Sequence, residues 1–128
     1  MLTRITPGSI HPPLADYCHA TLVPPGAGWL FCSGQLGIAP DGTIPDDIAD
    51  QARICFHNIR TILAEAGMGM ADLVRLNAYL TDEADLGAYM QVRDREVGRP
   101  TPASTLFVVK SFSRKQFKVE IEAVAAKV

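Results

Sequence analysis

The clearest pattern along the chain is helical and lies between residues 46 and 67. Apolar residues there recur three or four positions apart, as on one face of an α-helix, at Ile48, Ala52, Cys55, Ile59, Ile62 and Ala66. Asp46 or Asp47 can cap the N-terminus, because a carboxylate accepts hydrogen bonds from the free backbone N–H groups there. Gly67 suits the position just beyond the C-terminus. We therefore predict a helix that packs on one side.

A second helix is predicted over residues 83–97. Asp82 can cap its N-terminus, and Gly98 suits its end. The residues expected to point inward are Leu86, Met90 or Tyr89, and Val97.

The other apolar segments have strand patterns, at residues 18–23, 29–32, 74–80, 104–112 and 117–125. The first two flank a Pro/Gly-rich turn, so they are predicted to pair as a hairpin that ends at Ser33 and Gly34. The last segment alternates most regularly, with Phe117, Val119, Ile121 and Ala123 on one face and Lys118, Glu120 and Glu122 on the other.

The order of these segments predicts an α/β fold, a mixed sheet with two helices on one face. A chain of 128 residues suits a single domain over residues 1–128. The second face of the sheet has no helix to cover it and must meet solvent or another subunit. Apolar residues make up 48% of the chain, which is high for a small protein and favours burial beyond the core of one copy.

The composition argues against several classes of protein. The net charge is −2 and there is no run of Lys or Arg, so no nucleic-acid partner is expected. No apolar stretch is long enough to cross a membrane, and the N-terminus lacks the pattern of a signal peptide, so no membrane association and a cytoplasmic location are expected. Three cysteines without a CxxC pair indicate neither a disulfide framework nor a zinc site.

Two carboxylates on one strand face are the main candidates for chemistry. Glu120 and Glu122 are two residues apart, which places them about 7 Å from each other. They could divide acid and base work if one were buried. The alternative is a solvated strand face on which Lys118 neutralises them.

Other candidates carry weaker signals. His19 and His57 lie near cysteines but have no metal-ligand spacing, so structural or solvated roles are expected and no metal is implied. Ser33 and Gly34 follow an apolar strand, where a glycine allows close approach of a ligand and a serine can donate a hydrogen bond. A turn explains that pair equally well.

In their order and spacing, these segments resemble the RidA/YjgF family of small imine and enamine deaminases over nearly the whole chain. The segments that carry the resemblance are Tyr17, residues 33–35, residues 51–67, residues 72–80, Pro102 with Ala103, and residues 119–125. The resemblance implies a chorismate-mutase-like fold and a homotrimer with ligand clefts between subunits. It also implies hydrolysis of reactive enamines or imines to a keto acid and ammonia, without a metal or organic cofactor.

Several residues match the family's site. Tyr17 corresponds to the tyrosine that lines the cleft, and Ser33 with Gly34 to its Ser-Gly pair. Glu120 corresponds to the acid that positions water or relays a proton, and Glu122 is expected to have a structural or subunit-contact role.

The chain departs from the family at three positions of the cleft. The arginine that grips the substrate carboxylate is replaced by Ser104, next to Thr105, and Met90 and Leu106 stand where the family has Asn and Cys. Losing such a charge-assisted hydrogen bond costs about 1.5–3 kcal/mol. A substitute cation could come from Arg93, Arg95 or Arg99, although a solvated helix face explains these residues too. Without a substitute, a neutral or less acidic substrate is expected.

Three functions follow as hypotheses. The first is a deaminase or hydrolase of a small imine or enamine metabolite, with Glu120 activating water. The second is a non-catalytic trimer that binds a small metabolite in the same cleft, which Ser104, Met90 and Leu106 would make more apolar. An endoribonuclease or translation inhibitor is the third, and the charge balance gives it little support.

Overall fold

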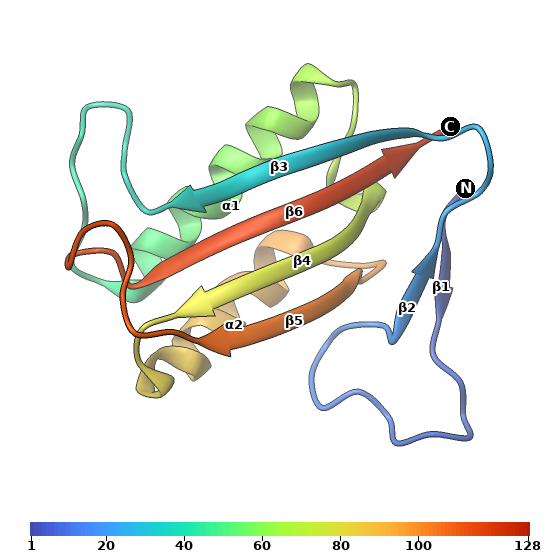
Figure 1. The fold of residues 1–128 in the computed structure, drawn as a ribbon, viewed down its shortest axis with the longest axis horizontal. Coiled ribbons are helices and arrows are strands. Elements are labelled where there is room, and N and C mark those ends of the chain that lie inside the picture. The colour runs from blue at the N-terminus through green and yellow to red at the C-terminus, as the bar shows by residue number, and fades with distance from the viewer.

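A four-stranded sheet backed by two helices forms the body of the protein in the computed structural model, which describes residues 1–128 (Figure 1). The strand order is β3 (Gly28–Leu36), β6 (Val119–Lys127), β4 (Leu73–Leu80) and β5 (Ala103–Val108). Strand β6 is antiparallel to both neighbours, whereas β4 and β5 are parallel and joined by a helical crossover. Helices α1 (Ile48–Glu65) and α2 (Leu86–Val97) lie behind the same face of the sheet (Figure 1). The predicted mixed sheet with two helices is confirmed.

The predicted hairpin between residues 18–23 and 29–32 is wrong. Strand β2 (Ala20–Leu22) pairs instead with β1 (Thr3–Ile5), as a separate antiparallel ribbon beside the main sheet (Figure 1). The segment around Trp29 belongs to the nine-residue strand β3, which pairs along its length with β6. A Pro/Gly-rich connection permits a tight hairpin, but it does not decide between that and pairing with distant strands.

Helix α1 follows the predicted apolar periodicity. Asp47 is the N-cap, and its carboxylate accepts a 3.1 Å hydrogen bond from the backbone N–H of Asp50. Phe56 and Leu63 are fully buried beside the predicted face. Ala66 was expected to point inward but is exposed, because the helix ends there as its C-cap.

Helix α2 buries only part of the predicted face: Tyr89 and Val97 are buried as expected, whereas Leu86 is not. A 3₁₀ turn, η2 (Glu83–Asp85), precedes the α-helix, and Leu86 at its start remains 43% exposed. Tyr89 is buried while Met90 is only half-buried. The buried side chains are those of Tyr89, Val92, Arg93 and Val97.

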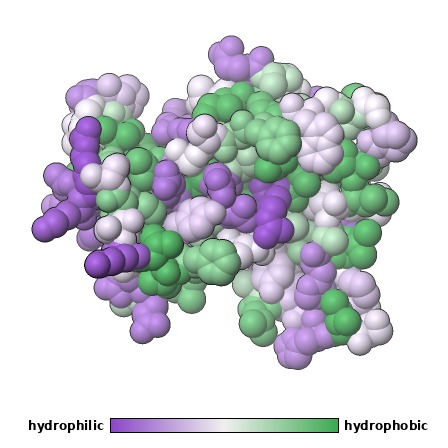
Figure 2. Space-filling model, viewed as in Figure 1, coloured by the Kyte–Doolittle hydropathy of each residue, from purple (hydrophilic) through white to green (hydrophobic).

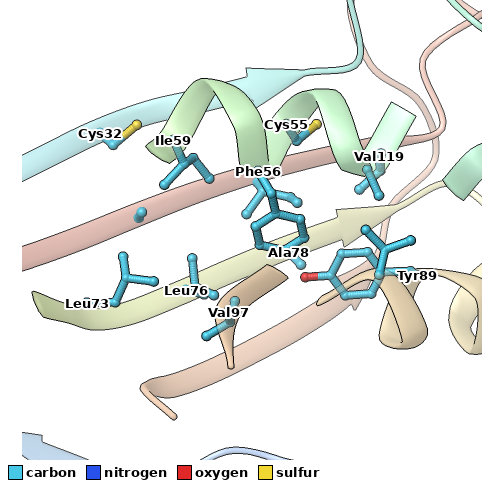
Figure 3. Close-up of a cluster of buried hydrophobic side chains, with 14 of the residues drawn as sticks. Cys32, Cys55, Phe56, Ile59, Leu73, Leu76, Ala78, Tyr89, Val97 and Val119 are labelled. Carbon is cyan, nitrogen blue, oxygen red and sulfur yellow. The ribbon is translucent and has the colours of Figure 1, made fainter. Parts of the chain in front are cut away.

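The core lies between the helices and the sheet (Figure 3). The rings of Phe56 from α1 and Tyr89 from α2 stack with their centroids 6.2 Å apart. Tyr89 lies within this cluster with its hydroxyl oxygen among apolar side chains (Figure 3). The alternate residues of β6 supply the sheet side, at Val119, Ile121, Ala123 and Ala125.

The opposite face of the sheet carries no covering element (Figure 1). Trp29 and Phe31 of β3 stack there with centroids 6.1 Å apart, and Phe31 is 76% exposed. Figure 2 shows this face, on which hydrophobic and hydrophilic side chains are mixed. We call it the bare face.

The ends of two strands differ from the predictions. Strand β5 stops at Val108, four residues before the predicted end, and β6 begins at Val119 and continues to Lys127. Phe117 is buried in the turn that precedes β6. Phe117 extended the alternating pattern of β6 although it lies outside the strand, so the strand was predicted to begin two residues too early.

Candidate functional site

Glu120 lies against the backbone of β3 at Gly34. The pairing of β3 with β6 shifts register between Cys32 and Gln35, so Gly34 lies at a bulge and β3 runs on to Leu36. A Cβ at position 34 would lie 2.5 Å from Oε2 of Glu120. A side chain at position 34 would therefore displace this carboxylate.

The environment of Glu120 favours its protonated form. Burial raises the pKa of this carboxyl above its ordinary value, and the neighbouring charge of Glu122 raises the pKa further. No hydrogen bond or salt bridge holds its carboxylate. A carboxyl group with a raised pKa can both accept and donate a proton nearer to neutral pH.

Glu122 is anchored, in contrast to Glu120. Its Oε1 accepts a 2.6 Å hydrogen bond from the hydroxyl of Tyr79 and a 3.2 Å bond from the amide of Asn77. The charge on Glu122 raises the pKa of Tyr79, because the phenol donates to a carboxylate. Arg75 extends the network by donating to Asn77 Oδ1 at 2.9 Å and to the hydroxyl of Thr105.

A hollow of about 370 Å³ opens over this part of the bare face. Its lining combines the two carboxylates with small, aromatic and hydroxyl groups, at Gly34, Tyr79, Val109, Ser111, Phe112, Glu120 and Glu122. We call it the Glu120 hollow. Ser33 lies in an adjoining hollow of about 300 Å³, which Glu122 also lines.

A second cavity, of about 500 Å³, lies between α2, β5 and the N-terminal loop. It brings together five of the predicted site residues, namely Tyr17, Met90, Ser104, Thr105 and Leu106. The rest of its lining is Leu14, Ala15, Leu86, Tyr89 and Arg93. We call it the α2–β5 cavity.

Of the three arginines considered as a substitute cation, only Arg93 lines the α2–β5 cavity. Arg99 forms a 3.1 Å salt bridge with Asp16 and is exposed to solvent. Arg95 is also exposed.

The predicted site residues thus fall on opposite faces of one sheet. Ser104 pairs with Leu76, and Leu76 with the buried Ala123, so Ser104 is on the helix-covered face. Glu120 pairs with Tyr79 on the bare face. Residues directly opposite each other in neighbouring strands share a face. Within one chain, Glu120 and Ser104 therefore do not meet.

Sequence reasoning missed some of the polar residues here. Arg75, Asn77 and Tyr79 alternate with core residues along β4. This alternation could have predicted that the three polar side chains share the face of the sheet opposite the core. Tyr89 was considered only as a core residue, and its place in the α2–β5 cavity has no sequence signal.

The structure holds no cluster of three or more residues suited to bind a metal ion. All three thiols are buried, and burial raises the pKa of Cys55 to about 12. That thiol is therefore a poor nucleophile. Neither helix has the length and hydropathy needed for a membrane span.

Comparison with known proteins places the chain in a family. The profile of the family described as Endoribonuclease L-PSP matches residues 9–127. The chain is 30% identical over 130 residues to "Putative reactive intermediate deaminase TdcF" of Escherichia coli, covering 98% of this chain and 94% of that one. It is 34% identical over 100 residues to the mitochondrial protein mmf1 of Schizosaccharomyces pombe, a match that covers 77% of this chain but only 62% of mmf1.

Solved structures agree with this. A protein of unknown function, YyfB of the Rid family from Yersinia pestis, has a TM-score of 0.87 at 26% identity, with 98% of both chains covered. The crystal structure of E. coli TdcF with bound serine has a TM-score of 0.73 at 31% identity, covering 96% of this chain and 94% of that one. The chain therefore belongs to the RidA/YjgF family, which the L-PSP profile describes.

Proposed function

We propose that this protein hydrolyses a small imine or enamine metabolite, with Glu120 as the group that transfers protons. The observation that carries the proposal is a carboxyl group of raised pKa, on a sheet face without covering elements, held against a glycine. The name of TdcF as a reactive intermediate deaminase, and its structure with serine, support a small nitrogen-bearing substrate.

The proposed chemistry needs one group that both accepts and returns a proton. The Glu120 carboxylate takes a proton from water as the water oxygen bonds to the imine carbon, and the proton passes to nitrogen. The hydroxyl proton of the resulting carbinolamine then moves to nitrogen by the same route. The C–N bond breaks, leaving a carbonyl product and ammonia. An enamine first takes a proton on carbon and gives up one from nitrogen, which converts it to the imine.

We further propose that the complete site is shared between copies of the chain in a homotrimer. Glu120 and Ser104 are on opposite faces of the sheet, so a substrate can reach both only if they come from different copies. The exposed aromatic side chains of the bare face, such as Phe31, provide an apolar surface for such contact. Glu120, Ser33 and Gly34 would come from one copy, and Tyr17, Met90, Ser104, Thr105 and Leu106 from its neighbour.

Product release tests the proposed reaction. A serine dehydratase supplies 2-aminoacrylate, and ammonia and pyruvate are followed with and without this protein; neutral imines are assayed in parallel. We expect acceleration that Glu120→Gln abolishes and that Glu65→Gln, at the exposed end of α1, leaves intact. Rates equal to buffer for every substrate would reject catalysis.

A non-catalytic metabolite-binding protein is the second candidate. The α2–β5 cavity favours it, since Ser104 there supplies no charge and Met90 and Leu106 contribute apolar surface. Crystals soaked in metabolite mixtures distinguish the two. An ordered ligand with no turnover in the assay above would favour binding alone.

A further inference from the structure

We propose that Arg93 of helix α2 is the specificity-determining cation of the α2–β5 cavity and binds the carboxylate of a small apolar monocarboxylate. This inference deepens the proposed function by naming the substrate class, and its substrate role rests on that function. Binding of the carboxylate itself can be tested without any turnover.

Arg93 is a buried cation without an acidic partner. Its side chain is only 3% exposed, yet it forms none of the salt bridges in the structure. One terminal nitrogen donates to the backbone carbonyl of Asp16, and the other contacts Met90 Sδ at 3.8 Å. Its Nε–H has no acceptor. A buried charge left unpaired is costly, so such a residue is typical of a site that a ligand completes.

A second unpartnered group lies one turn earlier on the same helix. The hydroxyl of Tyr89 is buried and makes no hydrogen bond. Tyr89 Oη and Arg93 Nε are the two buried side-chain polar atoms without partners in the whole structure, and both residues line the α2–β5 cavity. Buried polar atoms are normally paired with protein or water. The hydroxyl of Tyr89 points into the core (Figure 3), so the unpaired Nε–H of Arg93 is the group that an acceptor in this cavity would satisfy.

The charge of the cavity selects an anion. None of its ten lining residues is acidic. Asp16, whose backbone carbonyl accepts a hydrogen bond from Arg93, forms its side-chain salt bridge with Arg99. Within one copy, an anion that reaches Arg93 therefore meets a lining with one cation, the hydroxyls of Tyr17 and Ser104, and no acidic side chain.

The shape and polarity of the lining narrow the class of anion. A planar guanidinium matches the geometry of a carboxylate. Leu14, Leu86 and Leu106 supply apolar walls, and a volume of about 500 Å³ suits a small metabolite. A short-chain monocarboxylate fits both features. Arg93 would thus supply, from a helix, the charge that Ser104 does not supply from β5.

Paired probes of equal shape test this in the unaltered protein. Butyrate and butyramide differ by one charge, so calorimetric titration with each isolates the carboxylate. We expect butyrate to bind at least about tenfold more tightly, as for a charge-assisted hydrogen bond. Arg93→Gln should remove the difference, whereas Arg95→Gln, an exposed arginine of the same helix, should retain it. Equal affinities, or a preference that survives Arg93→Gln, would overturn the proposal.

A measurement on the unaltered protein covers the case in which Arg93→Gln does not fold. The Arg93 Nε–H resonance is followed by NMR during the butyrate titration. A saturable shift supports binding at this group, and no shift shows that a water molecule alone satisfies it and overturns the inference.

The inference and the proposed function fail separately. Glu120→Gln should stop turnover and keep the butyrate preference. Butyrate selectivity without turnover of any substrate would overturn the proposed function alone. Turnover without butyrate selectivity would overturn the role of Arg93 alone.

Discussion

The carboxylate of Glu120 occupies the space that a side chain at Gly34 would need, since a Cβ there would lie 2.5 Å from Oε2. This contact joins the bulge of β3 to the proposed proton-transfer group on β6. The position of Glu120 therefore depends on the absence of a side chain at residue 34.

Gly34→Ala is expected to displace Glu120 and lower kcat at least about tenfold, because a shift of about 1 Å misaligns a catalytic group. The thermal midpoint should fall only modestly, since the obstacle is the movable end of a side chain. Gly28→Ala on the same strand is the matched control, because its Cβ would meet only Lys127 O at 3.7 Å. Equal kcat for both variants would contradict a positioning role for Gly34.

The pH profile should report the coupling of Glu120 to Glu122. Activity that needs the Glu120 carboxylate rises as pH increases through its raised pKa. Glu122→Gln removes the neighbouring charge, so the pKa of Glu120 should fall and the acidic limb of kcat/KM should move to lower pH. An unchanged limb in Glu122→Gln would mean that another group controls it.

Glu120→Gln should stabilise the fold while removing activity. The pKa of this carboxyl is higher in the folded than in the unfolded state, so the folded state holds more protons between the two values. Stability is therefore lost as pH rises from the unfolded pKa through the folded pKa. At neutral pH the amide of Glu120→Gln carries no charge and avoids this cost. The free energy of unfolding should therefore rise, by less than about 1 kcal/mol because solvent screens a partly exposed group. Urea unfolding at pH 4 and pH 7 tests it, because the gain should appear only at pH 7.

Phe31→Glu should prevent assembly through the bare face. This side chain is 76% exposed in one copy, and a carboxylate there would have to be desolvated in an interface. Sedimentation velocity should show trimers for the unaltered protein and smaller species for Phe31→Glu. Ile10→Glu, an exposed residue of the N-terminal loop, should remain trimeric. An unaltered protein that sediments as a monomer at micromolar concentration would refute the shared site.

Local patterns predicted the elements of this fold better than their pairing. The spacing on α1 and the alternation on β6 reflect burial on one side, which each segment carries in its own residues. The partner of β2 is β1, and that choice depends on the rest of the sheet. On α2 the predicted burial fails at Leu86, which stays exposed at the start of the helix because η2 takes up the residues before it.

The sequence allowed the residues of the candidate site to be predicted, but not their positions relative to one another. The resemblance indicated Glu120, Tyr17 and Ser104 one by one, and their separation onto two faces required the strand register. Arg93 was one of three arginines with equal standing in the sequence. Only packing against the N-terminal loop distinguishes it from Arg95 and Arg99.

The reactivity of the buried cysteines can be used to measure how often this protein unfolds. Burial raises the pKa of Cys32 and Cys55, and Cys18 is also buried, so the folded chain presents little reactive thiolate. Alkylation by iodoacetamide should therefore be slow in the native protein and proceed only through unfolding. The labelling rate then measures the population of open molecules without an engineered label on the protein. It follows that the three thiols of the folded protein are shielded from electrophilic metabolites.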